Sequence, residues 1–207
     1  MLVTIHIMNS QHGSHIDNEK ERNPADFPLL GVLSLGPAHG YDLCAELRES
    51  LGEIWTLRAS HIYALLAGLE KDGLVSHERI DQENRPAKKV FHITPEGREV
   101  FSKWMNSPVG NVRDMRLEFF AKLHFARLES HGVASKLIDD QLKVCRKTVK
   151  RLVAQIEACH VEAERSILDY RLTMLHATVN WLRKARHANP IQSRQEPRVG
   201  KLANSIS

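Results

Sequence analysis

The pattern of apolar residues changes abruptly at Asp72-Gly73, and this change restricts the folds open to the chain. After it, apolar and polar residues alternate over 74–81 and again over 88–93, as in half-buried strands. Before it, apolar residues recur at the i, i+3, i+4, i+7 spacing of a helix with one buried face: Ile62, Leu65, Leu66 and Leu69. Because an Asp-Gly pair ends a helix, the segment is predicted to be a helix followed by a hairpin.

Two shorter helices are predicted before this segment. Residues 27–35 form an apolar run that Gly36-Pro37 stops. Residues 40–51 place their apolar side chains near one helical face, and Gly52 ends that helix. Ser60 is a plausible N-cap for the third helix, over 60–71.

The hairpin and the element after it carry their own markers. Asn84 and Pro86 favour a turn over 82–87. Thr94 is suited to cap a further helix, with Pro95 at its first position and Glu96 facing its positive end. Three helices, a hairpin and another helix in this order predict a winged helix-turn-helix, a mainly α (α+β) fold.

The chain divides into four predicted parts. A winged helix over 27–106 is followed by helical residues 112–187. Residues 1–26 lack periodicity and are expected to form a flexible arm, and residues 188–207 a flexible tail. No apolar run has the length of about 18 residues that a membrane span needs, and no signal peptide is recognised.

One face of the 60–71 helix is suited to approach DNA. Small residues on that face let a helix enter the major groove, and cations around the hairpin tip can neutralise phosphates. An ordinary amphipathic helix with a solvated face is the alternative interpretation, and Asp81 and Glu83 dilute the charge of the hairpin. The predicted DNA-binding residues are Ser60, His61, Tyr63, Ala64, Ala67, Lys71, Arg79, Arg85, Lys88 and Lys89.

Six stretches stand in a fixed order between about Leu29 and Phe125: Leu30-Gly31-Val32-Leu33, Gly36-Pro37-Ala38-His39-Gly40-Tyr41-Asp42-Leu43, Ser60-His61-Ile62-Tyr63, Leu69-Glu70-Lys71-Asp72-Gly73-Leu74, Lys88-Lys89-Val90-Phe91-His92-Ile93-Thr94 and Glu118-Phe119-Phe120-Ala121-Lys122-Leu123. In their order and spacing they resemble the PadR family of bacterial transcriptional regulators.

The resemblance implies a dimeric repressor that a small ligand releases from double-stranded DNA, with Tyr63 at the family's tyrosine position. Ser60 stands where relatives often carry glycine, and the hairpin tip lacks the usual glycines, which puts the base preference in doubt. His39 is interpreted as a structural turn residue. A transcriptional activator of the same fold and a winged helix that binds proteins remain alternatives.

Two heptad stripes follow the winged helix. The first recurs at alternating spacings of four and three residues, and the second follows the same rule. A break at 161–165 leaves open a hairpin or one bent helix, and the family resemblance favours an antiparallel hairpin. The residues predicted to hold two chains together are Phe119, Ile138, Leu142, Val149, Leu152, Ile156, Leu168, Leu172, Leu175, Val179 and Leu182.

Exposed stripes of this length favour association, because each buried Leu, Ile or Val contributes about 1.5–3 kcal/mol. An intramolecular bundle is the alternative. Cys145 and Cys159 lie on the first stripe and are interpreted as small buried hydrophobes. The three sparse cysteines fit a reducing cytoplasm.

Other functions have little support in the sequence. No Cys/His cluster has metal-ligand spacing, and no catalytic motif or cofactor fingerprint is recognised. The net charge of +4 permits a polyanionic partner without requiring one. We expect a small aromatic or amphipathic effector between the winged helix and the later helices, with walls from Trp104, Phe119, Phe120 and Trp181.

Overall fold

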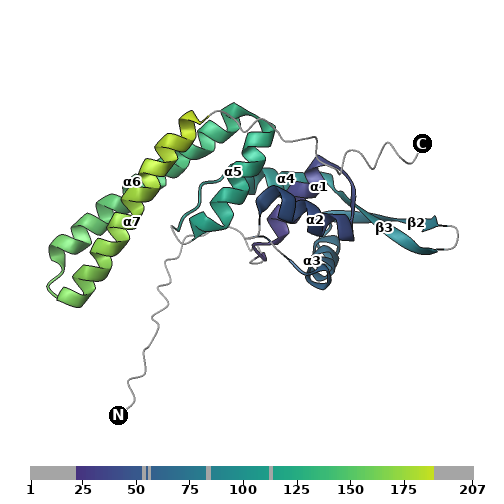
Figure 1. Cartoon of the computed structure of the whole chain (residues 1–207), viewed down its shortest axis with the longest axis horizontal. Helices are drawn as coiled ribbons and strands as arrows, with labels where there is room; N and C mark the ends of the chain where they lie inside the picture. Colours follow the sequence, from purple (N-terminus) through teal and green to yellow (C-terminus); the bar gives the residue numbers. More distant parts are fainter. Residues whose placement is uncertain (1–21, 53–54, 56, 83–84, 112–113, 189–207) are drawn as a thin grey trace, which may run out of the picture.

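A computed structural model describes residues 22–52, 55, 57–82, 85–111 and 114–188. The first seven elements are α1 (Asp26–Leu35), β1 (Ala38–His39), α2 (Gly40–Leu51), α3 (Ala59–Lys71), β2 (Val75–Gln82), β3 (Arg85–Ile93) and α4 (Pro95–Met105). They are followed by η2 (Asp114–Arg116), α5 (Glu118–Glu129), α6 (His131–Ala158) and α7 (Glu162–His187). The α6–α7 hairpin extends from one side of the winged helix and the β2–β3 hairpin from the opposite side (Figure 1). The predicted winged helix with a helical C-terminal region is confirmed.

The sheet has three antiparallel strands in the order β1-β3-β2. Val75 pairs with Ile93 at one end of the β2–β3 hairpin, and Arg79 pairs with Lys89 nearer its tip. The two-residue strand β1, which the sequence did not predict, pairs Ala38 with Phe91 and His39 with Val90. The His39 ring nitrogen Nδ1 lies 3.1 Å from the carbonyl oxygen of Lys89, in keeping with a structural role.

Two predicted boundaries were wrong. Helix α3 begins at Ala59 after an extended Arg58, so Ser60 lies in the first turn and does not cap the helix. Strand β3 already begins at Arg85, inside the expected turn over 82–87. Extended backbone suits Pro86, since proline is compatible with a strand at a hairpin end.

Thr94 caps α4 as predicted. Its hydroxyl oxygen accepts a hydrogen bond from the backbone N–H of Gly97 at 3.0 Å, and Pro95 occupies the first turn. The hydroxyl also donates to the carbonyl of Gly73 at 2.8 Å, which ties the end of the α3–β2 turn to the start of α4. Gly97 packs so closely on β2 that an added Cβ would lie 2.1 Å from the carbonyl oxygen of Leu74.

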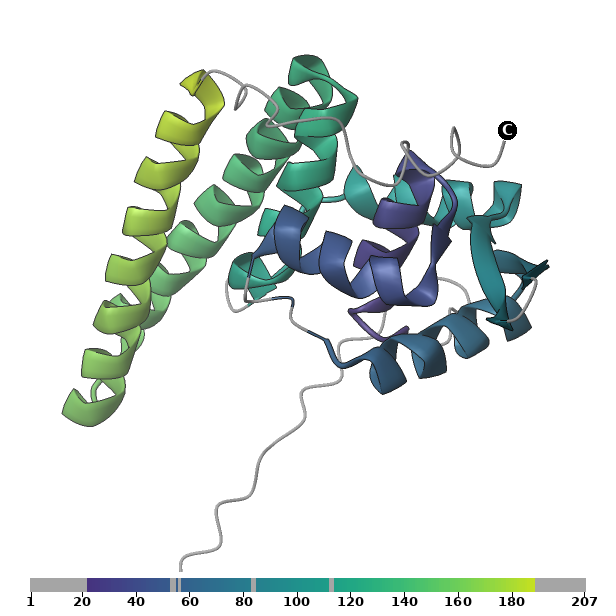
Figure 2. The ribbon, with the colours of Figure 1, turned by 45° about the vertical axis from the view of Figure 1, so that its right-hand side comes forward.

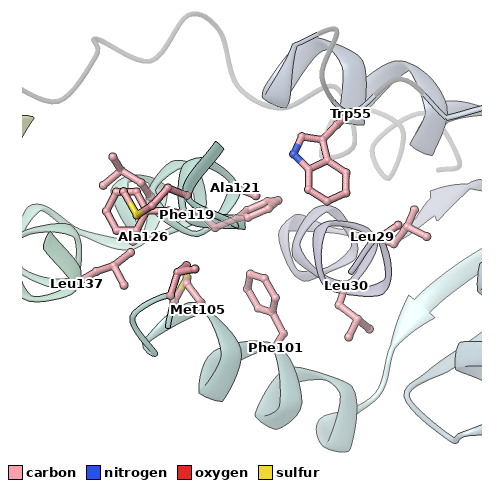
Figure 3. Close-up of a cluster of buried hydrophobic side chains, with 14 of the residues drawn as sticks. Leu29, Leu30, Trp55, Phe101, Met105, Phe119, Ala121, Ala126 and Leu137 are labelled. Carbon is pink, nitrogen blue, oxygen red and sulfur yellow. The ribbon is translucent and has the colours of Figure 1, made fainter. Parts of the chain in front are cut away.

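A single core joins the winged helix to the C-terminal helices. Phe101 and Met105 project from α4 toward α1 and α5 (Figure 3). The Phe101 ring meets the Phe125 ring of α5 edge to face, with centroids 5.3 Å apart. A Cβ at Gly31 of α1 would approach that same Phe125 ring to 2.5 Å, so this glycine allows α1 and α5 to pack closely.

The two heptad stripes pack against each other within one chain. Helices α6 and α7 form an antiparallel hairpin (Figure 2), and the break lies at 159–161, slightly before the predicted position. Cys145 is buried in the stripe as expected, whereas Cys159 is half-buried beyond the end of α6. Most predicted dimer residues are therefore buried inside the chain: Phe119, Ile138, Leu142, Leu152, Ile156, Leu168, Leu175, Val179 and Leu182, with Val149 and Leu172 partly buried.

Residues 22–26, placed in the flexible arm by the sequence, partly pack on the winged helix. Arg22 forms an ion pair with Asp72 at 2.9 Å, Ala25 is buried, and α1 begins at Asp26. The rest of the predicted arm and nearly all of the predicted tail lie outside the described residues. Within the described part of the chain, no helix combines the length and apolar character of a membrane span.

Candidate DNA interface

Helix α3 divides cleanly into a buried and an exposed face. Its apolar stripe anchors it against the core: Ile62, Leu65, Leu66 and Leu69. The opposite face is open to solvent, including all six of its residues predicted to contact DNA: Ser60, His61, Tyr63, Ala64, Ala67 and Lys71. Gly68 adds no side chain to this face, and the space beside it is open, since an added Cβ would meet nothing within 4 Å. A convex helix face with small side chains at its centre fits the major groove.

Tyr63 combines a structural contact with exposure. Its side chain is 45% exposed, and its ring lies 6.4 Å from that of Phe91 on β3. A Cβ at Gly40, the first residue of α2, would lie 2.5 Å from the Tyr63 ring. Gly40 therefore makes room for the ring and fixes where the Tyr63 hydroxyl is presented.

The N-terminal end of α3 has an additional property. No side chain caps this end among the described residues, and Arg58 and Ser60 are exposed there. Backbone N–H groups in a helix's first turn attract anions such as phosphate. Lys71, in contrast, lies at the other end of α3.

The β2–β3 hairpin presents cations on its surface. Arg79 on β2 lies directly across from Lys89 on β3, and Lys88 follows on the opposite face; all three are exposed. Exposed cations on a hairpin of this kind can contact phosphate groups. The side chain of Arg85, also predicted to bind DNA, lies outside the described residues.

Sequence reasoning missed Tyr41. This residue follows Gly40 in the first turn of α2 and is 74% exposed, the largest exposed fraction among the large apolar side chains of the described region. A phenol hydroxyl at a helix start beside α3 can donate a hydrogen bond to a phosphate. The helical pattern of 40–51 grouped Tyr41 with Leu43 and Leu47 near one apolar face; those two leucines are buried, but the placement of Tyr41 was wrong.

The four residues predicted to bind an effector separate into two groups. Phe119, Phe120 and Trp181 meet, with ring centroids 5.0–6.5 Å apart. Trp104 lies elsewhere and stacks on Phe27 at 4.9 Å. The structure therefore does not bring the four rings together into one wall.

Trp104 is covered by a buried cation. The Lys122 side chain is only 2% exposed, its Nζ lies 5.0 Å from the Trp104 ring centroid, and it donates to the carbonyl of Ser107 at 2.9 Å. Burial lowers the pKa of this ammonium group, and the hydrogen bond and charge of Glu118 at 2.6 Å oppose the shift. This network joins the α4–α5 connection to α5 and has the character of a structural link.

A second link joins the same connection to α6. The buried Gln141 side chain accepts from the Val109 backbone N–H at 2.6 Å and donates to the Val109 carbonyl at 2.9 Å. The side-chain amide thus satisfies both backbone hydrogen-bonding groups of Val109, as a neighbouring strand would. Among the described residues, no group of three His, Cys, Asp or Glu side chains is arranged to hold a metal ion.

Comparison with known proteins agrees with this architecture. Residues 29–103 match the family described as "Transcriptional regulator PadR-like family". This chain carries a PadR-like regulator domain. The matched residues run from α1 to α4, which is the winged helix, so the resemblance inferred from the sequence is confirmed there.

Two individual relatives are also named as transcriptional regulators. The chain is similar to the "Negative transcriptional regulator PadR" of Bacillus subtilis (strain 168), with 28% identity over 138 residues, 67% of this chain and 76% of that protein. It is also similar to "Probable transcriptional regulator Rv1176c" of Mycobacterium tuberculosis, with 32% identity over 88 residues, 42% of this chain and 47% of that protein. The first relative is named as a negative regulator of transcription and the second as a probable regulator.

A solved structure of Bacillus subtilis PadR in complex with operator DNA is similar at 24% sequence identity, with a TM-score of 0.41. The match covers 78% of this chain and 97% of the PadR chain.

Proposed function

We propose that this PadR-like regulator is a homodimeric repressor that binds an inverted-repeat DNA operator in the cytoplasm and is released by a small effector. The observation that carries the DNA-binding part is the solvent-exposed face of α3, on the same domain as a hairpin that carries exposed cations. Repression is supported by the name of the Bacillus subtilis relative, a negative regulator. Activation by the same DNA contact is the alternative mode of control.

In this proposal the two elements have different tasks. The low face around Ala64 and Ala67 enters the major groove, and Tyr63 with Ser60 and His61 reads base edges at the N-terminal end of α3. The hairpin cations neutralise phosphates and position the domain without reading sequence. Arg85 is included among these cations on the strength of the sequence.

Removing the hairpin cations separates these tasks. Replacing Lys88 and Lys89 together by alanine is expected to weaken binding roughly tenfold or more on every DNA sequence and to reduce the salt slope by about two, because about two phosphate contacts are lost. Fluorescence anisotropy at several salt concentrations measures both quantities. An unchanged affinity and slope, with the fold intact, would show that the hairpin does not contact DNA.

Tyr63 is expected to affect the choice of sequence. Tyr63→Ala should weaken operator binding by about 1–3 kcal/mol while leaving nonspecific binding nearly unchanged. Tyr63→Phe is the matched control, since it keeps the ring packed against Gly40 and removes only the hydroxyl. Equal losses on operator and random DNA for the alanine variant would contradict a role in base reading.

The proposed dimer needs a surface other than the stripes already buried within the chain. Helix α7 carries another heptad stripe, distinct from the two buried stripes, whose side chains are exposed: Ile167, Tyr170, Met174, Ala177 and Trp181. It falls on a different helical face from Leu168, Leu175 and Leu182, which pack against α6. This exposed stripe is the proposed contact between two copies.

Charge along α7 favours an antiparallel arrangement of the two copies. Its first turn carries the acidic residues Glu162 and Glu164, and its last turn carries the basic residues Lys184 and Arg186. Antiparallel pairing places each acidic end beside a basic end of the other copy, whereas parallel pairing places like charges together. The same arrangement brings the two Met174 residues together near the two-fold axis.

Met174→Lys is therefore expected to disrupt the dimer. Two ammonium groups would meet at the axis, and such like-charge contacts cost several kcal/mol, so the dimer should dissociate at micromolar concentration. Analytical ultracentrifugation of the full chain gives the oligomeric state. Asn180→Lys adds the same charge to another exposed face of α7 and should leave the dimer intact; if both variants stay dimeric, the contact lies elsewhere.

A further inference from the structure

A groove runs between α6 and α7 on the side away from the exposed heptad stripe. Its volume is about 540 Å³, within the range of about 300–1,000 Å³ typical of small-molecule sites. Val149 of α6 and Val179 of α7 form its apolar floor. Val179 is buried and Val149 partly buried, so the floor belongs to the packed seam of the hairpin.

The rim of this groove is strongly cationic. Arg146 and Lys150 line it from α6 and Arg183 from α7, and all three are exposed. His176 and Asn180 add hydrogen-bonding groups. Together the two helices focus positive charge on a concave apolar surface.

Acidic residues that could balance this charge are absent from the adjacent sequence. Neither 141–156 nor 170–187 contains an aspartate or glutamate. One helical turn or more beyond the rim, Asp139 is already paired with Arg186 at 2.8 Å. Packing of the hairpin does not require this concentration of cations, since like charges on facing helices repel.

We propose that the groove between α6 and α7 binds a small amphipathic organic anion, whose carboxylate lies between Arg146 and Arg183 and whose apolar body covers Val149 and Val179. Guanidinium groups bind carboxylates through paired, charge-assisted hydrogen bonds. A DNA backbone could also use the cations, but it would leave the apolar floor uncovered, so the observations favour the small molecule.

This ligand would bridge the two helices of the proposed dimerisation arm. The residues of the exposed stripe do not line the groove, so a ligand and a second copy of the chain can be bound together. Binding itself is independent of the proposed repressor function; only its use as the effector signal rests on that function.

The experiment uses the full chain and the fluorescent probe anilinonaphthalene sulfonate, an aromatic sulfonate that is anionic and apolar. Probe affinity is measured for the wild type and for Arg146→Gln/Arg183→Gln, without DNA. Lys147→Gln/Arg171→Gln is the matched control, because it removes two exposed cations from the same helices outside the groove. Octanoate and octylammonium then compete for the bound probe.

We expect the groove variant to bind the probe at least tenfold more weakly and the control variant to stay within twofold of the wild type. Octanoate should displace the probe and octylammonium should not. No loss in the groove variant, equal losses in both variants, or displacement by both competitors would overturn the proposal. If the groove variant kept probe binding but lost DNA affinity in a separate anisotropy measurement, the cations would be assigned to DNA instead. Because the probe assay contains no DNA, a failure here leaves the proposed DNA-binding function untouched.

Discussion

Replacing Ala67 by glutamate is expected to reduce DNA affinity by at least about 100-fold. Ala67 lies on the exposed face of α3, where a longer acidic side chain would be held between phosphate backbones, and such like-charge contacts cost several kcal/mol. The fold should not change, because glutamate has a good helix propensity and the site is open to solvent. Fluorescence anisotropy with DNA from the upstream intergenic region measures the loss.

Two matched variants separate the effect of the charge at position 67 from the effect of side-chain size and from the effect of the protein's net charge. Ala67→Gln has nearly the same size as the glutamate variant without the charge and should lose less affinity. Ala154→Glu adds the same charge to an exposed position on α6 and should bind DNA almost like the wild type. If Ala67→Glu bound as tightly as Ala154→Glu, α3 would not be the element in the major groove.

The largest loss of stability is expected for Gly97→Ala. The added Cβ would lie 2.1 Å from the carbonyl oxygen of Leu74 and 2.9 Å from a side-chain carbon of Ile93. The oxygen belongs to the backbone at the start of the hairpin, so it can move only by displacing β2 from α4. We expect a loss of about 1–3 kcal/mol, as for other overpacked sites, and a melting temperature lower by about 2–4 °C for each kcal/mol.

Gly68→Ala is the matched control for this substitution. It lies inside α3, and an added Cβ would meet nothing within 4 Å, so alanine should stabilise the helix by about 0.5–1 kcal/mol. Thermal unfolding followed by circular dichroism compares the two variants. A Gly97→Ala variant as stable as the wild type would show that α4 is not packed against β2 as described.

Local chemistry made much of the winged helix predictable. The Thr94 cap needs only the residues from Thr94 to Gly97, and the end of α3 needs only Asp72-Gly73, so sequence reasoning placed both. Strand β1 could not be found in this way. Its two residues are extended because they pair with Phe91 and Val90, about 50 positions later in the chain, and no local pattern reports such a pairing.

The helical arm shows a different limit. A stripe such as Leu168, Leu175 and Leu182 predicts that a helix packs against another helix, but it has the same form whether the other helix belongs to the same chain or to a second copy. The structure shows intramolecular packing. The exposed stripe through Ile167 and Met174 has the same spacing, but the stripe beside it is richer in leucine and therefore gives the clearer heptad pattern.

The candidate DNA face could be predicted from the sequence, whereas the groove between α6 and α7 could not. The exposed residues of α3 are the complement of one helix's own apolar stripe, so one helix was enough to predict them. The groove needs the register between two helices, which places Arg146 beside Arg183. That register follows from tertiary packing, so the sequence showed the cations without showing that they share one concavity.

Footprinting of the full chain on its own upstream DNA tests the DNA-binding account most directly. The account predicts protection of two half-sites related by two-fold symmetry and about 34–36 Å apart, with the protection lost in Ala67→Glu and retained in Ala154→Glu. Absence of protection at low salt, or equal protection by both variants, would contradict it.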